Sequence, residues 1–153
     1  MEGFIPHIIG NTETTAFEYL PAKKQTADYV VGQALVWDDA NGYLDIASGA
    51  VTPEYFAYTN GNVADDKDPL CVTRVRDDII YETHAAAAMT GIDIGSMVTI
   101  ATAGATYPNG VRVSNITSGG TATIVGYAPV VVGGTTIAAE GAAGCKVYVK
   151  FEI

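Results

Sequence analysis

The amino-acid sequence predicts an all-β protein, organised as a single small β-barrel or β-sandwich domain with an extended N-terminal arm. Short segments rich in β-branched and apolar residues follow one another along the chain, turn residues separate them, and no long helical pattern lies between them. A chain of 153 residues suits one domain. We therefore place the arm at residues 1–17 and the barrel or sandwich at residues 18–153.

The N-terminal segment shows no clear periodicity. Gly3, Pro6 and Gly10 interrupt it, and a polar run follows at residues 11–15. Such extended segments are ordered by a neighbouring subunit or remain mobile. Both possibilities stay open for residues 1–17.

A hairpin is the clearest local structure that the sequence predicts. Residues 34–38 and 43–47 alternate apolar and polar side chains around a turn that contains Asn41-Gly42, a dipeptide that tolerates left-handed backbone conformations. The side chains expected to share the inward faces are Leu35, Trp37, Leu44 and Ile46.

Further strands are expected along the rest of the chain. They lie at residues 70–76, 78–83, 95–101, 111–113, 122–127 and 130–132. Pro129 separates the last two because proline cannot donate a hydrogen bond within a sheet. Gly119-Gly120 and Gly133-Gly134 are interpreted as turns, and residues 84–89 as a single helical turn or an irregular loop, since six residues are too few for a stable helix.

The final strand has the strictest alternation. Apolar side chains recur at every second position from 146 to 153, which predicts a half-buried strand that fixes the chain end in the sheet. These residues are Val147, Val149, Phe151 and Ile153.

The charge composition argues against several classes of partner. Charged residues make up 16% of the chain, below the usual fraction of about 25%, and the net charge is −9. Eight scattered lysines and arginines cannot neutralise a phosphate backbone, so we expect no nucleic-acid partner and no anionic membrane partner. The low charge fraction favours a surface that is partly covered in an assembly.

The cysteines and the distribution of apolar residues indicate in which cellular compartment the protein is expected. Cys71 and Cys145 form neither a metal-binding spacing nor a redox motif, so we interpret them as buried free thiols in a reducing environment. Residues 1–10 lack the basic and apolar regions of a signal peptide, and no apolar run is long enough to span a bilayer. We expect no export by the usual signal.

No residue pattern supports catalysis or metal binding. His84 and Glu82 would share one strand face, but neither has a second histidine or a cysteine at ligand spacing. The acidic turns Asp65–Asp68 and Asp38–Asn41 lack the alternating spacing and closing glutamate of a calcium loop. We assign no catalytic, cofactor-binding or metal-ligating residue and expect no enzyme activity, although a cation in either acidic turn stays open.

Tyrosine is unusually frequent. Nine tyrosines are spread over nearly every predicted strand. Tyrosine is common at protein–protein contacts because it joins a large apolar ring to a polar hydroxyl. Tyrosines on strand surfaces and at core edges are also typical of β proteins, and this interpretation is the simpler one.

The order of these segments resembles that of phage head decoration proteins. The resemblance rests on residues 31–38 with 42–47, on 76–82 with 94–100, on 119–126 and on 146–151, and it extends from about Tyr29 to Ile153. Residues 85–88 and 59–69 depart from the lean form of such proteins.

The resemblance implies a structural role. It implies a virion protein of a tailed bacteriophage, assembled in the bacterial cytoplasm, that cements the outer surface of the capsid by bridging capsomers. The implied partners are the major capsid protein and further copies of the same chain, most commonly as a homotrimer. Another virion subunit, such as a head-fibre base or tail component, a cell-surface adhesive module and, as a third class, a small β-barrel enzyme or ligand binder remain alternatives.

Overall fold

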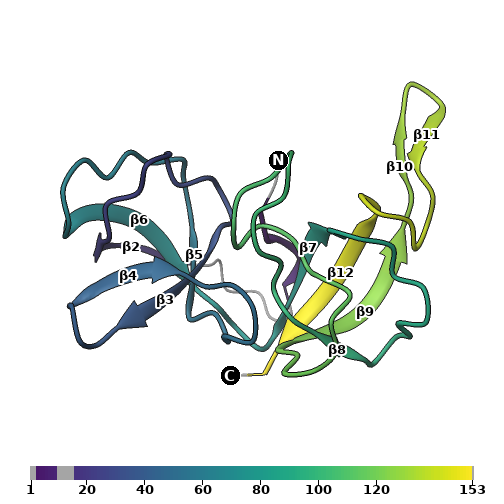
Figure 1. The fold of residues 1–153 in the computed structure, drawn as a ribbon, viewed down its shortest axis with the longest axis horizontal. Helices are drawn as coiled ribbons and strands as arrows, with labels where there is room; N and C mark the ends of the chain where they lie inside the picture. The colour runs from purple at the N-terminus through teal and green to yellow at the C-terminus, as the bar shows by residue number, and fades with distance from the viewer. Residues whose placement is uncertain (1–2, 10–15, 153) are drawn as a thin grey trace.

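The computed structural model describes residues 3–9 and 16–152. This part of the chain contains twelve strands and no helix, which confirms the all-β fold class. The strands form two β units and a projecting hairpin, so the expectation of one barrel or one sandwich is too simple (Figure 1).

The first unit is a closed five-stranded barrel with the order β2-β4-β3-β5-β6. Its strands are β2 (Phe17–Ala22), β3 (Ala34–Asp38), β4 (Tyr43–Ile46), β5 (Tyr55–Ala57) and β6 (Asp68–Arg74). All pairs are antiparallel except β2 with β4, which meet in parallel at Ala22 and Leu44. That parallel contact closes the barrel.

The second unit is an open antiparallel sheet with the order β1-β7-β12-β9-β8. Its strands are β1 (Ile5–Ile9), β7 (Ile79–His84), β8 (Met97–Val98), β9 (Ala122–Ala128) and β12 (Lys146–Phe151). Between β9 and β12 the chain forms a two-stranded hairpin of β10 (Val130–Val132) and β11 (Thr135–Ala138). Figure 1 shows the barrel and the sheet side by side, with this hairpin extending beyond the sheet.

Of residues 1–17, which were expected to form an extended arm, Ile5–Ile9 form the edge strand β1 of the sheet and Phe17 begins β2 of the barrel. β1 pairs with β7, and the side chain of Phe4 is 1% exposed. Its ring stacks on Phe56 of the barrel, with 5.1 Å between the centroids, so the N-terminal segment also packs against the barrel. Residues 10–15, which also fall within the expected arm, lie outside the described residues.

The predicted hairpin at residues 34–47 is confirmed as β3 and β4. Leu35 and Leu44 are fully buried inside the barrel, where Trp37 and Ile46 pack against them. The turn differs in one respect: Gly42 has a φ of 73°, whereas Asn41 has no positive φ. The glycine alone therefore takes the left-handed position.

The predicted C-terminal strand is confirmed over β12. Val147, Val149 and Phe151 are buried on one face and alternate with more exposed side chains. Pro129 separates β9 from β10, as expected. Of residues 84–89, His84 ends β7 and Ala85 forms a single bridge with Val113, while the rest are irregular.

Residues 99–121 are mostly irregular, although strands were predicted there. Their backbone joins the two units: Ala34 donates a hydrogen bond to the Gly110 carbonyl, and Ala86 donates one to the Val113 carbonyl. Gly49 and Ile100 exchange two backbone hydrogen bonds. Other backbone groups of the segment pair with each other, as in the bonds from Thr99 to Ile116 and from Ala101 to Arg112, so the segment folds back on itself between the two units.

Two apolar cores follow from this arrangement. One fills the barrel interior, and the other lies between the sheet and the outer face of the barrel strands β3 and β5. In β5, Tyr55 and Ala57 point into the barrel, whereas Phe56 packs in the second core against Tyr81 and Phe151. β5 is thus buried on both faces and connects the two cores.

Candidate functional site

The histidine and glutamate singled out in the sequence lie on the outer face of the sheet. Glu82 of β7 contacts Lys146 of β12 at 3.1 Å and Nδ1 of His7 of β1 at 3.6 Å. The His7 ring also lies 4.4 Å from the ring of Tyr148. The hydrogen bond from Lys146 to Glu82 raises the pKa of the lysine above its usual 10.5. His84 and Glu82 occupy the less buried face of β7, as the alternation predicted.

Glu82 and Lys146 form a half-exposed ion pair. The side chains of Glu82 and Lys146 are 25% and 39% exposed, so water screens the charges. Among the described residues, no three or more histidine, cysteine, aspartate or glutamate side chains are placed to hold a metal ion.

The acidic turns use their carboxylates to fix the backbone. Asp38 accepts hydrogen bonds from the backbone N–H groups of Ala40 and Asn41 and from the Asn41 side chain. The side-chain bond from Asn41, followed by these backbone bonds, lowers the Asp38 pKa. In the other turn, Asp68 accepts from the Asp65 N–H group at 3.1 Å. In each turn at least one carboxylate thus fixes the local backbone.

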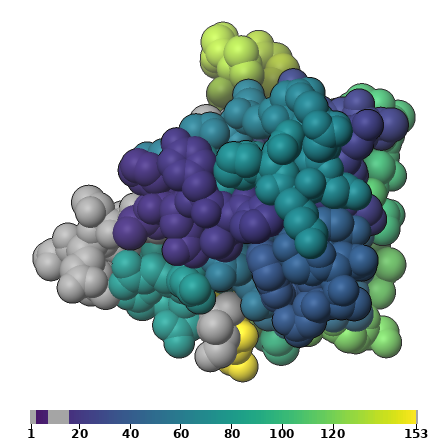
Figure 2. Space-filling model, turned by 90° about the vertical axis from the view of Figure 1, so that its left-hand side faces the viewer, coloured from purple at the N-terminus to yellow at the C-terminus, as the bar shows by residue number. Residues whose placement is uncertain are grey.

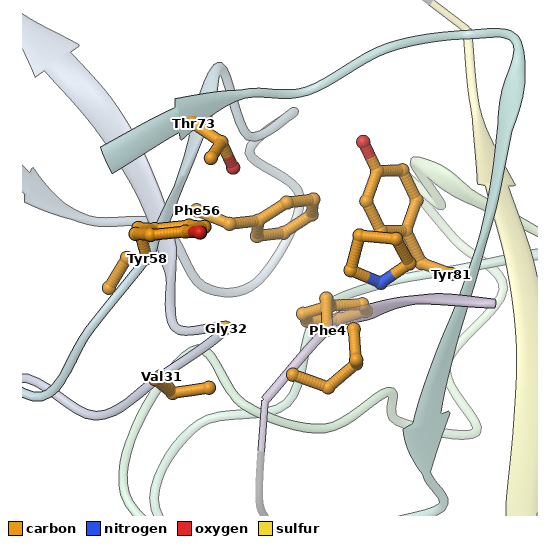
Figure 3. Close-up of a pocket in the computed structure, with 10 residues that line it drawn as sticks. Phe4, Val31, Gly32, Phe56, Tyr58, Thr73 and Tyr81 are labelled. Atoms are coloured by element: carbon orange, nitrogen blue, oxygen red, sulfur yellow. The ribbon is translucent and has the colours of Figure 1, made fainter. Parts of the chain in front are cut away.

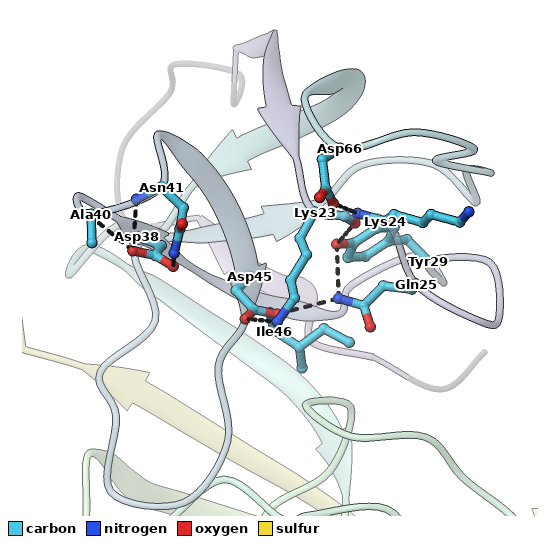
Figure 4. A network of polar contacts seen from close by, with 10 residues as sticks. All are labelled: Lys23, Lys24, Gln25, Tyr29, Asp38, Ala40, Asn41, Asp45, Ile46 and Asp66. Atoms are coloured by element: carbon cyan, nitrogen blue, oxygen red, sulfur yellow. Dashed lines mark hydrogen bonds and ion pairs between the residues drawn. The ribbon is translucent and has the colours of Figure 1, made fainter.

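A polar network fastens the loop after β2 to the barrel (Figure 4). Lys23 contacts Asp45 of β4 at 2.9 Å, and Gln25 donates to the same carboxylate at 3.2 Å. The buried Tyr29 hydroxyl donates to the Lys23 carbonyl at 2.6 Å, and burial raises the Tyr29 pKa. Each polar group serves the fold here, so we assign this network a structural role.

Three of the nine tyrosines are buried, two are exposed, and the other four are partly buried. Tyr29, Tyr55 and Tyr81 are core residues, whereas Tyr19 and Tyr58 are 66% and 49% exposed. The exposed pair lies with another ring on the barrel surface. We call Phe17, Tyr19 and Tyr58 the ring patch.

The ring patch is ordered by contacts between its own rings. Phe17 stacks on Tyr58 with 5.1 Å between centroids, and Tyr19 meets Phe17 edge to face at 6.4 Å. Phe17 and Tyr19 belong to β2, while Tyr58 follows β5 and donates its backbone N–H to Cys71 of β6. Figure 2 views the molecule from this barrel side. Three pre-positioned rings on a closed barrel form an apolar contact surface that costs little side-chain entropy to use.

Beside the ring patch lies a pocket at the junction of the barrel and the sheet (Figure 3). Its volume is about 360 Å³, and Tyr58 belongs to both the patch and the pocket wall. The wall includes Phe4, Val31, Phe56, Thr73 and Tyr81. Two backbone hydrogen bonds hold its floor, from Phe4 to Gly32 and from Gly32 to Ala57, both at 2.7 Å. We call this cavity the junction pocket.

The β10–β11 hairpin is the second exposed apolar feature. Val131, Val132 and Ile137 are 53%, 63% and 65% exposed. The turn consists of Gly133 and Gly134, whose φ values of 57° and 80° give the double left-handed geometry that a two-residue hairpin loop favours. The predicted Gly-Gly turn is confirmed, but its return strand at residues 135–138 was not predicted.

Both cysteines are buried free thiols, as expected. Cys71 lies in the barrel strand β6, and Cys145 precedes β12 in the core of the sheet. Burial raises the pKa of the Cys145 thiol, which lowers its reactivity near neutral pH.

Comparison of the chain with protein families, curated proteins and solved structures gave no match. Of the described residues, none form a helix that is long and apolar enough to cross a membrane. The candidate sites come from the structure alone: they are the ring patch, the junction pocket and the β10–β11 hairpin. Sequence reasoning found the tyrosines as a group but missed the junction pocket, since its walls come from segments far apart in the chain.

Proposed function

We propose that this chain is a non-enzymatic structural subunit of a virion, which binds the outer surface of a tailed-phage capsid and stabilises the shell by bridging capsomers. One observation carries the proposal: exposed apolar side chains are grouped at two places among the described residues, the ring patch on the barrel and the β10–β11 hairpin beyond the sheet. Exposed apolar surfaces of this kind mark contacts with other proteins.

A bridging subunit needs two contact surfaces held apart by a rigid body. The closed barrel and the shared aromatic core supply that body. Each contact can be weak, because many copies on a symmetric shell act together. In this proposal the ring patch faces the capsid, and the hairpin joins neighbouring copies.

The charge of the chain supports a position outside the shell. With a net charge of −9, the subunit gains nothing from the packaged DNA, which its carboxylates would repel. A charged fraction of 16% leaves much surface that is uncharged and suited to burial in an assembly. The two buried free thiols suit assembly in a reducing bacterial cytoplasm.

Co-sedimentation with capsids tests the proposal. Purified protein is mixed with expanded heads assembled from the major capsid protein encoded in the same genome, and the bound fraction is measured after pelleting. We expect saturable binding at a fixed ratio to the capsid protein. Absence of binding to both immature and expanded heads contradicts the proposal.

The test has a matched pair of variants. Phe17→Ser with Tyr19→Ser removes two rings of the ring patch and should weaken head binding at least tenfold. Ile116→Ser is the control, because Ile116 is 56% exposed, like Phe17 at 55%, but lies outside the patch. Equal loss in both variants would show that the patch has no specific role.

A glycan-binding adhesive module is the second candidate. The ring patch favours it, since exposed aromatic faces can stack on the apolar faces of sugar rings. A glycan array probed with the wild type and with the Phe17→Ser, Tyr19→Ser variant separates the two functions. Specific glycan binding that the double variant loses, together with no binding to heads, would favour the adhesive role.

A further inference from the structure

The aromatic wall of the junction pocket is fixed by contacts among its own rings. Phe4 stacks on Phe56, and Phe56 meets Tyr81 edge to face with 4.8 Å between the ring centroids. The three side chains are at most 2% exposed. Figure 3 shows Phe4 and Tyr81 on one side of the cavity and Tyr58 and Val31 on the other. The wall is thus ordered before any ligand arrives, which lowers the entropic cost of binding.

Two glycines let bare backbone form the floor of the pocket. Gly32 has a φ of 77°, and a Cβ atom at this position would lie 2.6 Å from the backbone nitrogen of Phe4. A Cβ atom at Gly3 would lie 2.2 Å from the carbonyl carbon of Gly32. A side chain at either glycine would push the two segments apart. The pocket therefore keeps its shape because the backbones of residues 3–4 and 32 are in direct contact.

The volume of the pocket suits a small molecule. Its 360 Å³ lies within the range of about 300–1,000 Å³ that is typical of ligand sites. An apolar cavity of about 150 Å³ is already large enough to bind benzene. The junction pocket therefore has room for a compound of one or two rings.

The chemistry of the wall narrows the class of ligand. No described residue that lines the pocket carries a charge, so an ionised ligand would lose its hydration without gaining an ionic partner. The aromatic wall favours flat rings, which pack against it offset or edge to face. The Tyr81 hydroxyl already accepts a hydrogen bond from the backbone of Arg76 at 3.1 Å. The hydroxyls of Tyr58 and the buried Thr73 are the other polar side-chain groups of the lining, and each can bond to a ligand.

We infer that the junction pocket binds a small, uncharged aromatic compound of one or two rings that carries a hydroxyl group. The ligand ring packs between Val31 on one side and Phe4 and Tyr81 on the other, and the ligand hydroxyl bonds to the hydroxyl of Thr73. This inference concerns the pocket alone and does not require the proposed role on a capsid.

Equilibrium dialysis of the full chain against naphthol tests the inference. The control compound is naphthoate, which has the same two rings but carries a negative charge at neutral pH. We expect one saturable site per chain for naphthol and binding at least tenfold weaker for naphthoate, because nothing in the pocket neutralises the charge. No saturable binding of naphthol, or equal binding of the two compounds, would overturn the inference.

A variant that fills the pocket tests the location of the site. Val31→Trp places a large ring on the half-buried pocket wall and should weaken naphthol binding at least tenfold. Ile116→Trp is the control, because it adds the same ring at a position that is 56% exposed and outside the pocket. Nuclear Overhauser effects between naphthol and the rings of Phe4 and Phe56 locate the ligand in the wild type. Equal binding by both variants, or contacts of naphthol with other residues only, would refute the site.

The contact with Thr73 has a test of its own. Thr73→Val keeps the shape of the side chain and removes its hydroxyl, so it should weaken naphthol binding about fivefold, the effect of one neutral hydrogen bond. Binding of naphthalene, which has no hydroxyl, should stay unchanged. The same change for both compounds, or no change for either, would contradict the assignment of a hydroxyl-bearing ligand. Head binding is measured separately, so its failure would leave this inference standing.

Discussion

The barrel and the sheet differ in whether they have strands with an unpaired edge. The barrel is closed, so each of its strands has a neighbour on both sides. The sheet is open, with β1 and β8 at its edges, and its chain continues into a projecting hairpin. Because the barrel has no free strand edge, its contacts with partners are made by side chains, such as the aromatic rings of the ring patch. The sheet presents whole strands, and partners can enclose them.

The two units also differ in which residues form their apolar cores. The barrel core is self-contained, whereas the core of the sheet includes residues of barrel strands, such as Ala34 and Phe56. The sheet therefore depends on the barrel more than the barrel depends on the sheet. Both native thiols are buried in the folded state, so a labelling reagent reaches each of them only when its surroundings open. Cys71 lies in the barrel and Cys145 in the sheet, so the labelling rate of each thiol measures the opening of one unit.

The largest effect is expected where the two units share a core. Phe56→Ala removes a ring that contacts Phe4, Tyr81 and Phe151, and should lower the free energy of unfolding by about 4 kcal/mol. Urea unfolding measures the loss. Labelling with iodoacetamide should speed up at both native thiols, and acceleration at Cys71 alone would show that the sheet does not depend on this ring.

A smaller and more local effect is expected inside the barrel. Leu44→Ala creates a cavity at a fully buried position and should cost about 3 kcal/mol. The cavity lies in the barrel core alone, so labelling of Cys71 should accelerate more than labelling of Cys145. Equal acceleration would contradict the view that the barrel core is separate from the core of the sheet.

A third effect tests the segment that joins the units. The buried Thr83 hydroxyl of β7 donates to the Val111 carbonyl at 2.6 Å. Thr83→Val keeps the shape but removes this donor from a buried acceptor, and should cost about 1.5 kcal/mol in urea unfolding. Thr123→Val is the control, since Thr123 occupies a half-buried strand position. A cost below that of the control would show that this hydrogen bond is not important for the junction.

Local sequence pattern predicted those elements whose burial differs between the two faces of one strand. β12 was predicted almost to the residue because it buries every second side chain, whereas the β3–β4 hairpin was predicted because Asn41-Gly42 marks its turn between two apolar segments. The pattern fails in β5, which is buried on both faces and is only three residues long. It fails again in β1, whose partner β7 lies seventy or more positions away, so the pairing leaves no local signal.

The candidate sites follow the same rule. The abundance of tyrosine indicated contact surfaces, but it did not show that Tyr19 and Tyr58 are exposed while Tyr29 and Tyr81 are buried. The junction pocket depends on the packing of β1 against the barrel, which only the tertiary structure supplies. The apolar strand at residues 130–132 was predicted from sequence, but its exposure could not be, because an apolar strand is normally taken to be buried.

The smallest effect is expected on the outer face of the sheet. Glu82→Gln removes the half-exposed ion pair with Lys146, and at neutral pH it should cost below about 1 kcal/mol, since water screens the pair. The Lys146 pKa is raised in the folded state, so the pair stabilises the fold fully below the unfolded pKa of about 10.5 and loses this effect as the pH rises through the raised value. The difference between wild type and variant in urea unfolding should therefore hold at pH 8 and shrink towards zero above pH 10.5. A difference that stays constant over that range would mean that Glu82 acts through packing rather than charge.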